Sequence, residues 1–136
     1  MAIGAGAVAL GTVLALTLPA LLAEAERPRE GRRPLRPPTA VHAEGRCSGF
    51  LQAEVSLGWE PSVSSFADGY EVYRSTVSGG PYERVAFVPG HGTTAYLDDD
   101  VGMGADFYYV IKSTTGRRDG PPSDQVGVGT PVGCFF

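Results

Sequence analysis

The sequence has no asparagine, a single lysine and only two histidines. Without asparagine it holds no Asn-x-Ser/Thr glycosylation site. Neither His42 nor His91 has a Cys, Asp or His three or four residues away, the spacing that metal sites use, and neither lies in a nucleophile motif. We therefore expect both histidines at the surface or at a sheet edge. We also expect no metal, no cofactor and no enzymatic activity.

Positive charge is scarce in most of the chain. Residues 47–136 carry five basic and eleven acidic side chains, a surface that repels phosphate backbones, so nucleic acid is excluded as an expected partner. The chain has ten arginines for its one lysine, and Gly, Ala, Val and Pro are abundant. GC-rich codons produce this bias, which indicates a bacterial source of high GC content.

The amino terminus is a hydrophobic run without charge. Residues 2–22 hold no charged side chain and are long enough to cross a bilayer as a helix, so the membrane is the first expected partner. No Lys or Arg precedes the run. Pro19 and the small-x-small sequence at residues 23–25 favour a cleaved signal peptide, whereas the length of the run favours a transmembrane anchor. Both interpretations of residues 1–25 stay open.

Residues 26–36 form a segment rich in Pro and Arg, and we expect it to be a disordered linker because it has too few apolar residues to fold. It is either a solvated spacer or a contact for anionic headgroups and wall polymers. Read alone, its arginines would keep the following domain in the cytoplasm by the positive-inside rule.

After Pro38 the apolar pattern changes to a period of two. In EVSLGWE, Val55, Leu57 and Trp59 share one face, which is typical of a half-buried antiparallel strand. Similar short runs recur between clusters of Gly, Pro, Ser and Asp, in the segments GYEVYRS, YERVAFV, TAYLD, FYYVIKS and QVGVGT. No helical periodicity of any length appears after residue 22. The pattern predicts an all-β sandwich.

The order of these segments resembles the fibronectin type III family. The resemblance rests on PPTAVHA, SLGWEPS, DGYEVYRSTVSGGPYERVAFV, TAYLDDDVGMGADFYYVIKS and PPSDQVGVGTP, which are similar to that family's strands A, B, C with C′, E with F, and G. It implies an immunoglobulin-like β-sandwich over residues 37–136. Trp59 matches the strand B tryptophan. Phe107 stands where the family has a corner tyrosine, and Met103 stands where a proline is common.

The family topology also bears on the two cysteines. Strands A and G end at the same pole of such a sandwich, so the resemblance places Cys47 in the A-to-B loop and Cys134 just after G, within reach of each other. The alternatives are a disulfide and two unrelated buried thiols. A disulfide implies an oxidising compartment, which argues for an extracytoplasmic domain against the charge bias of the linker.

Two loops carry charge clusters. Residues 98–100 are three aspartates that a calcium ion could accept, but the spacing of an EF-hand is absent and Asp98 matches a turn residue of the family. Arg117 and Arg118 precede Asp119 in the expected F-to-G loop, in the wrong order for an integrin-binding motif. We interpret residues 119–122 as a turn, with the two arginines as an alternative ligand contact.

Tyr73 and Tyr108 are expected to point outward from neighbouring strands, with Arg74 on the opposite face. Outward aromatic side chains bind sugars or proteins, and they also stabilise sheets as cross-strand pairs. Residues 54, 60, 71 and 83 are glutamates on strands, where they serve as solvated charges, since a glycosidase needs its carboxylates in a cleft. The sequence therefore predicts a non-enzymatic interaction or spacer domain of the cell envelope, secreted or held at the membrane. The alternative is an accessory module for polysaccharide binding or degradation; either an unknown protein or a cell-wall polysaccharide would be its partner.

Overall fold

The computed structural model describes residues 33–135. The hydrophobic segment and residues 26–32 of the expected linker lie outside the described residues. Within residues 33–135 the regular secondary structure consists of strands. The same residues contain no helix with the length and apolar character needed to cross a membrane.

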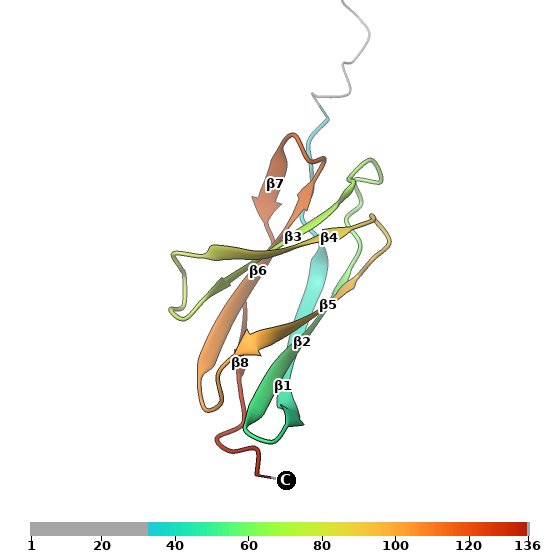
Figure 1. The fold of residues 1–136 in the computed structure, drawn as a ribbon. Coiled ribbons are helices and arrows are strands. Elements are labelled where there is room, and N and C mark those ends of the chain that lie inside the picture. The colour runs from blue at the N-terminus through green and yellow to red at the C-terminus, as the bar shows by residue number, and fades with distance from the viewer. Residues whose placement is uncertain (1–32, 136) are drawn as a thin grey trace, which may run out of the picture. The chain divides into compact units, whose positions relative to one another are not determined.

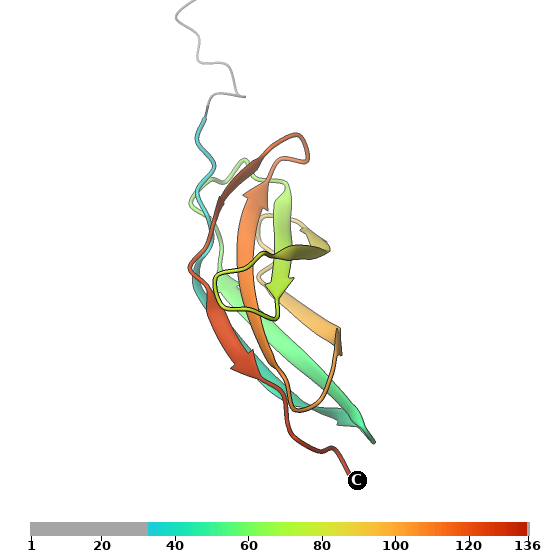
Figure 2. The same cartoon turned by 90° about the vertical axis from the view of Figure 1, so that its left-hand side faces the viewer.

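Two antiparallel sheets form the sandwich (Figures 1 and 2). One sheet has three strands in the order β1, β2, β5, with bounds Thr39–Gly49, Gln52–Glu60 and Ala95–Val101. The second sheet has the order β4, β3, β6, with bounds Glu83–Pro89, Gly69–Ser75 and Asp106–Thr114. Its far edge is divided between β7 (Asp119–Pro122) and β8 (Val126–Gly129), which both pair with β6. The all-β expectation is confirmed.

Alternation along each strand sends every second side chain into the core. In β2, Val55, Leu57 and Trp59 are buried, as their spacing predicted, and in β3 and β6 the residues that pair across the inner face are buried too. The cluster between the sheets consists of Val55, Leu57, Trp59, Tyr70, Val72, Val88, Phe107, Tyr109 and Ile111. Because its members come from four strands, β2 of one sheet and β3, β4 and β6 of the other, the core depends on both sheets being present.

An aromatic pair closes one end of this core. The rings of Trp59 and Tyr70 meet edge to face, with centroids 5.4 Å apart. The Tyr70 hydroxyl donates to the His91 carbonyl oxygen at 2.6 Å and accepts from the Ser62 backbone N–H at 3.0 Å. Tyr70 thereby ties the β2–β3 connection to the β4–β5 turn.

The folded unit begins earlier than the sequence indicates. Leu35 is buried, and the carbonyl oxygen of Arg36 accepts from the hydroxyls of Ser62 at 2.6 Å and Ser113 at 2.7 Å. The compact unit starts at Pro34, three residues before the boundary expected at Pro37. Residues 34–36 therefore pack as part of the domain instead of continuing the linker.

The interpretation of residues 119–122 as a turn was wrong. They form β7, in which Asp119 pairs with Thr114 and Pro122 with Lys112. A proline is tolerated in a strand at the edge of a sheet, because its missing N–H removes no bond to a second neighbour.

The two ends of the described chain lie at opposite poles. Figure 1 shows the chain approaching β1 at one pole and the tail after β8 reaching the other, beside the β1–β2 turn. A hydrogen bond from the Leu51 N–H to the Cys134 carbonyl oxygen, 2.7 Å long, fixes the tail there.

Candidate functional site

Tyr73 and Tyr108 lie on the outer face of the five-stranded sheet. Tyr73 pairs with Val110 and Tyr108 with Ser75, so both side chains point away from the core, and both are half-buried. The Lys112 ammonium group sits 4.4 Å from the centroid of the Tyr73 ring. Burial raises the pKa of the Tyr73 hydroxyl above its ordinary value, and the negative charge of Asp119 adds to the rise.

The β3–β4 connection reaches Gln125, which follows β7. The side-chain oxygen of Gln125 accepts from the Gly79 N–H at 2.7 Å and from the Tyr82 hydroxyl, and its amide nitrogen donates to the Ser78 hydroxyl at 3.0 Å.

Val110, which also faces outward, is only 5% exposed. No ring contact between Tyr73 and Tyr108 occurs in the described part of the chain. The two tyrosines are thus separate surface features, and their role as a ligand face stays a prediction.

A buried ion pair joins the two sheets on the inner side. Asp98 in β5 is 1% exposed, and its carboxylate oxygens lie 2.9 and 3.1 Å from Nη1 of Arg74 in β3. The Tyr109 hydroxyl donates to the same carboxylate at 2.7 Å. Burial and this hydrogen bond raise the pKa of Tyr109. The assignment of Asp98 to a turn was wrong: it is a strand residue that holds an inward-facing arginine.

Beside Arg74 the surface is hollowed into a groove of about 440 Å³. We call it the Arg74 groove, and its walls include Arg74, Thr76, Pro81, Tyr82, Glu83 and Phe107. It combines a guanidinium group, a carboxylate and aromatic rings, which together suit a polar ligand with apolar faces. From the sequence, Arg74 was expected only to lie on the face of the strand opposite Tyr73. The groove was not foreseen, because its residues meet only through the pairing of β3 with β4 and β6.

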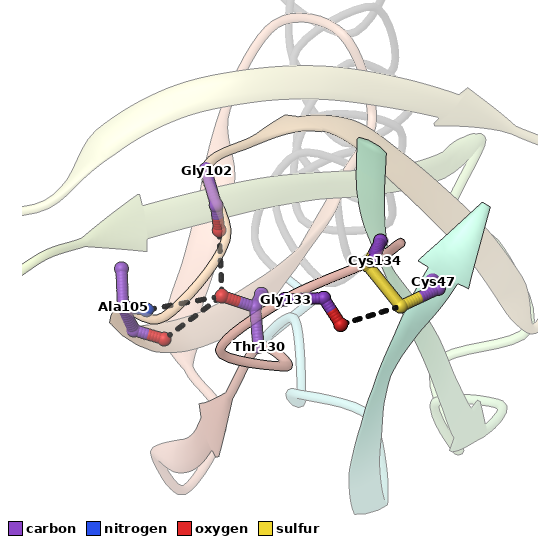
Figure 3. The surroundings of a disulfide bond; sticks show 6 residues. All are labelled: Cys47, Gly102, Ala105, Thr130, Gly133 and Cys134. Atoms are coloured by element: carbon purple, nitrogen blue, oxygen red, sulfur yellow. Dashed lines mark hydrogen bonds between the residues drawn. A yellow bond between two sulfur atoms is a disulfide. The ribbon is translucent and has the colours of Figure 1, made fainter. Parts of the chain in front are cut away.

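The two cysteines form a disulfide that links β1 to the carboxyl-terminal tail (Figure 3). Their sulfur atoms are bonded, and the two residues are 87 positions apart in the sequence. The pairing is confirmed, with one correction. Cys47 lies inside β1, opposite Ala53 of β2, and not in the loop that follows the strand.

Near the disulfide, Thr130 secures the turn between β5 and β6 (Figure 3). Its hydroxyl donates to the Gly102 carbonyl oxygen at 2.6 Å and accepts from the Ala105 N–H at 3.1 Å. Phe107, at the corner position, is buried. The turn thus gains from Thr130 a hydroxyl contact of the kind that the missing corner tyrosine would supply.

The remaining candidate residues lie apart from these features. His42 is on β1, with Nδ1 3.0 Å from the Ala40 carbonyl oxygen, and His91 is half-buried in the β4–β5 turn, where its ring contacts the Ser62 carbonyl oxygen. Arg117 and Arg118 lie in the β6–β7 turn. Within residues 33–135 no group of three His, Cys, Asp or Glu side chains is placed to hold a metal ion.

Comparison with known proteins identifies the fold. A fibronectin-like protein from Clostridium thermocellum superposes with a TM-score of 0.61 at 29% identity, over 73% of this chain and 96% of that one. A fibronectin type III domain of human contactin 1 superposes with a TM-score of 0.60 at 15% identity, over 80% and 90% of the two chains. The latter likeness shows the fold alone.

A curated relative shares part of the sequence. The amylopullulanase of Thermoanaerobacter thermohydrosulfuricus is 36% identical over 64 residues, which are 46% of this chain and 4% of that enzyme. The chain therefore spans a small fraction of the length of this relative. No protein-family model matches the sequence.

Proposed function

We propose that this chain, in which residues 33–135 have the fibronectin type III fold, is a non-enzymatic accessory module that associates with carbohydrate outside the cytoplasm. The observation that carries the proposal is the sequence identity shared with an amylopullulanase, a polysaccharide-acting enzyme, over 64 residues. The likeness to a bacterial protein of the same fold supports it. Both comparisons involve bacterial proteins, in agreement with the source inferred from composition.

The disulfide supports the compartment. Disulfides form and persist in oxidising surroundings, so the Cys47–Cys134 bond favours the periplasm, the cell surface or the medium. The apolar segment at residues 2–22 would bring the domain there, either as a cleaved signal or as an anchor. The amino terminus of the mature protein, read by mass spectrometry from membranes and from culture medium, distinguishes these two forms.

A second candidate is an interaction or spacer domain. The described chain runs from one pole of the sandwich to the other (Figure 1), as a spacer between two attached parts would. At the pole that holds the β1–β2 turn and the carboxyl-terminal tail, Phe50, Leu51 and Phe135 are 64%, 50% and 74% exposed. Large exposed apolar groups favour contact with another protein.

Retention on isolated cell-wall polysaccharide tests the proposal against this alternative. The full chain in detergent micelles is passed over the immobilised polysaccharide, beside the variants Tyr73→Ala and Tyr108→Ala. We expect retention of the parent chain. Flow-through of the parent from every polysaccharide tried would contradict an association with carbohydrate and leave the spacer role. Loss of retention in the tyrosine variants would place the contact on the outer sheet face.

A further inference from the structure

The Arg74 groove lies where β3 ends and β4 begins. Both strands belong to the five-stranded sheet, and Val88 of β4 packs in the core between the sheets. Val85 and Ala86 of β4 are half-buried and pack against the same core. The β3–β4 hairpin projects from the side of the sandwich (Figure 1), and the groove lies against this hairpin.

Arg74 presents unused donors to the groove. Its Nη1 atom contacts the Asp98 carboxylate and donates to the Asp100 carbonyl oxygen at 3.0 Å. Within residues 33–135 the N–H groups on Nε and Nη2 make no hydrogen bond; an Asp100 carboxylate oxygen lies 3.9 Å from Nη2, and the guanidinium carbon lies 5.7 Å from the centroid of the Phe107 ring. The side chain is 19% exposed. These two nitrogens form the edge of the guanidinium that suits a pair of neighbouring acceptors.

Glu83 supplies a hydrogen-bond acceptor to the same groove. It is exposed and lies opposite Arg74 in the register of β3 and β4. Its carboxylate accepts hydrogen bonds only. Tyr82 and Phe107 supply ring surface in the same groove. Sugar hydroxyls donate and accept hydrogen bonds, and the C–H faces of a sugar ring pack on aromatic rings. The guanidinium, the carboxylate and the aromatic rings of the groove therefore each match a part of a sugar.

The charge of the Arg74 groove favours a neutral sugar over an acidic one. The Arg74 charge is already compensated by the buried Asp98 carboxylate, and Glu83 leaves the groove with a surplus negative charge. The surrounding residues 47–136 carry eleven acidic side chains against five basic ones. A carboxylate ligand would be repelled, whereas a neutral ligand would not.

We propose that the Arg74 groove binds a neutral oligosaccharide, with Arg74 donating to neighbouring hydroxyls, Glu83 accepting from another, and the Tyr82 ring packing against the sugar. This inference rests on the proposed carbohydrate association and assigns it a site and a ligand class. The site lies on the other side of the sheet from Tyr73 and Tyr108.

The test measures retention of the full chain, in detergent micelles, on four immobilised neutral glycans: pullulan, amylose, xylan and mannan. A uronate polymer, polygalacturonate, serves as the acidic comparison. Glu83→Ala removes the acceptor, and Thr76→Trp fills the groove; both positions are exposed, so folding is preserved. We expect each variant to lower the affinity for the retained neutral glycan by about tenfold. Glu60→Ala, which removes an exposed carboxylate at the end of β2, should bind like the parent.

The outcomes separate the site from the function. If Tyr73→Ala and Tyr108→Ala abolish retention while Glu83→Ala and Thr76→Trp do not, the association with carbohydrate holds and the groove assignment is refuted. Stronger retention on polygalacturonate than on every neutral glycan overturns the ligand class. If the parent chain is retained by none of the five polymers, both the groove and the association with carbohydrate are overturned.

Discussion

The disulfide should supply much of the stability of this domain. Cys47 and Cys134 are 87 positions apart, so the bond closes a loop that contains most of the folded residues. In the chain-entropy model a loop of this length restricts the unfolded state by about 4 to 5 kcal/mol. A domain of this size has a free energy of unfolding of about 5 to 15 kcal/mol. The double variant Cys47→Ala, Cys134→Ala should therefore lose about a quarter or more of the total.

The assay is urea unfolding of the full chain at 25 °C, followed by the fluorescence of the single tryptophan, Trp59. Alanine is chosen because Cys134 is fully buried and a serine would bury an unpaired hydroxyl there. Reduction of the parent serves as the control: it should lower the unfolding midpoint to that of the double variant and leave the variant unchanged.

A loss below about 1 kcal/mol would refute the reasoning. It would mean that the unfolded chain is already compact enough for the cross-link to remove little entropy. In the double variant the tail keeps its native contacts other than the disulfide. Among them is the hydrogen bond from Leu51 to Cys134, which uses the backbone alone.

Three further predictions concern the core, a turn and the response to pH. Trp59→Ala should lower the free energy of unfolding by about 3 to 5 kcal/mol in urea, since the ring is 4% exposed and packs on Tyr70; a change under about 1 kcal/mol would show that the ring adds little to the core. Thr130→Val keeps the shape but removes the hydroxyl that bridges Gly102 and Ala105, so calorimetry should show a loss of about 1 to 3 kcal/mol, and an unchanged transition would argue against this bridge. The raised pKa of Tyr109 means that its contribution to stability is complete below the ordinary pKa of about 10 and declines as the pH rises above it. Between about pH 9 and 11 the free energy of unfolding, measured by urea titration, should therefore fall less in Tyr109→Phe than in the parent. An equal fall in the two proteins would contradict a contribution from Tyr109 ionisation.

Alternation along single strands was readable from the sequence. Val55, Leu57 and Trp59 are buried together because a strand sends every second side chain to one face, whatever its neighbours are. The outward direction of Tyr73 and Tyr108 followed from the same rule. These features depend on local geometry alone, so the order of residues determines them.

Features that join distant strands were harder to foresee. Asp98 was assigned to a turn because it matches a turn residue of the fibronectin type III family. In the structure its burial is offset by Arg74 and Tyr109, which belong to the other sheet. An isolated segment gives no sign of such a partner, because the cost of burying a carboxylate is met only after the sheets pack.

The start and the edge of the domain depended on packing in the same way. Arg36 belongs to a segment whose composition predicts disorder, yet two hydroxyls from other parts of the fold bind its carbonyl oxygen. Asp119 and Pro122 read as a turn, and they form a strand because β6 offers an open edge. Composition averages over a segment, whereas a few long-range hydrogen bonds decide whether it is ordered.

Local sequence patterns predicted the strands other than β7 and their buried faces, and the resemblance to the fibronectin type III family placed Cys47 and Cys134 at one pole. The tertiary structure alone decided the Arg74–Asp98 pair, the Thr130 bridge and the groove beside the β3–β4 hairpin. The physical reason is range. The direction of a side chain in a strand is fixed by its own backbone, whereas a buried charge, a capped turn or a concave surface needs distant partners that only strand pairing and the packing of the sheets bring within a few ångströms.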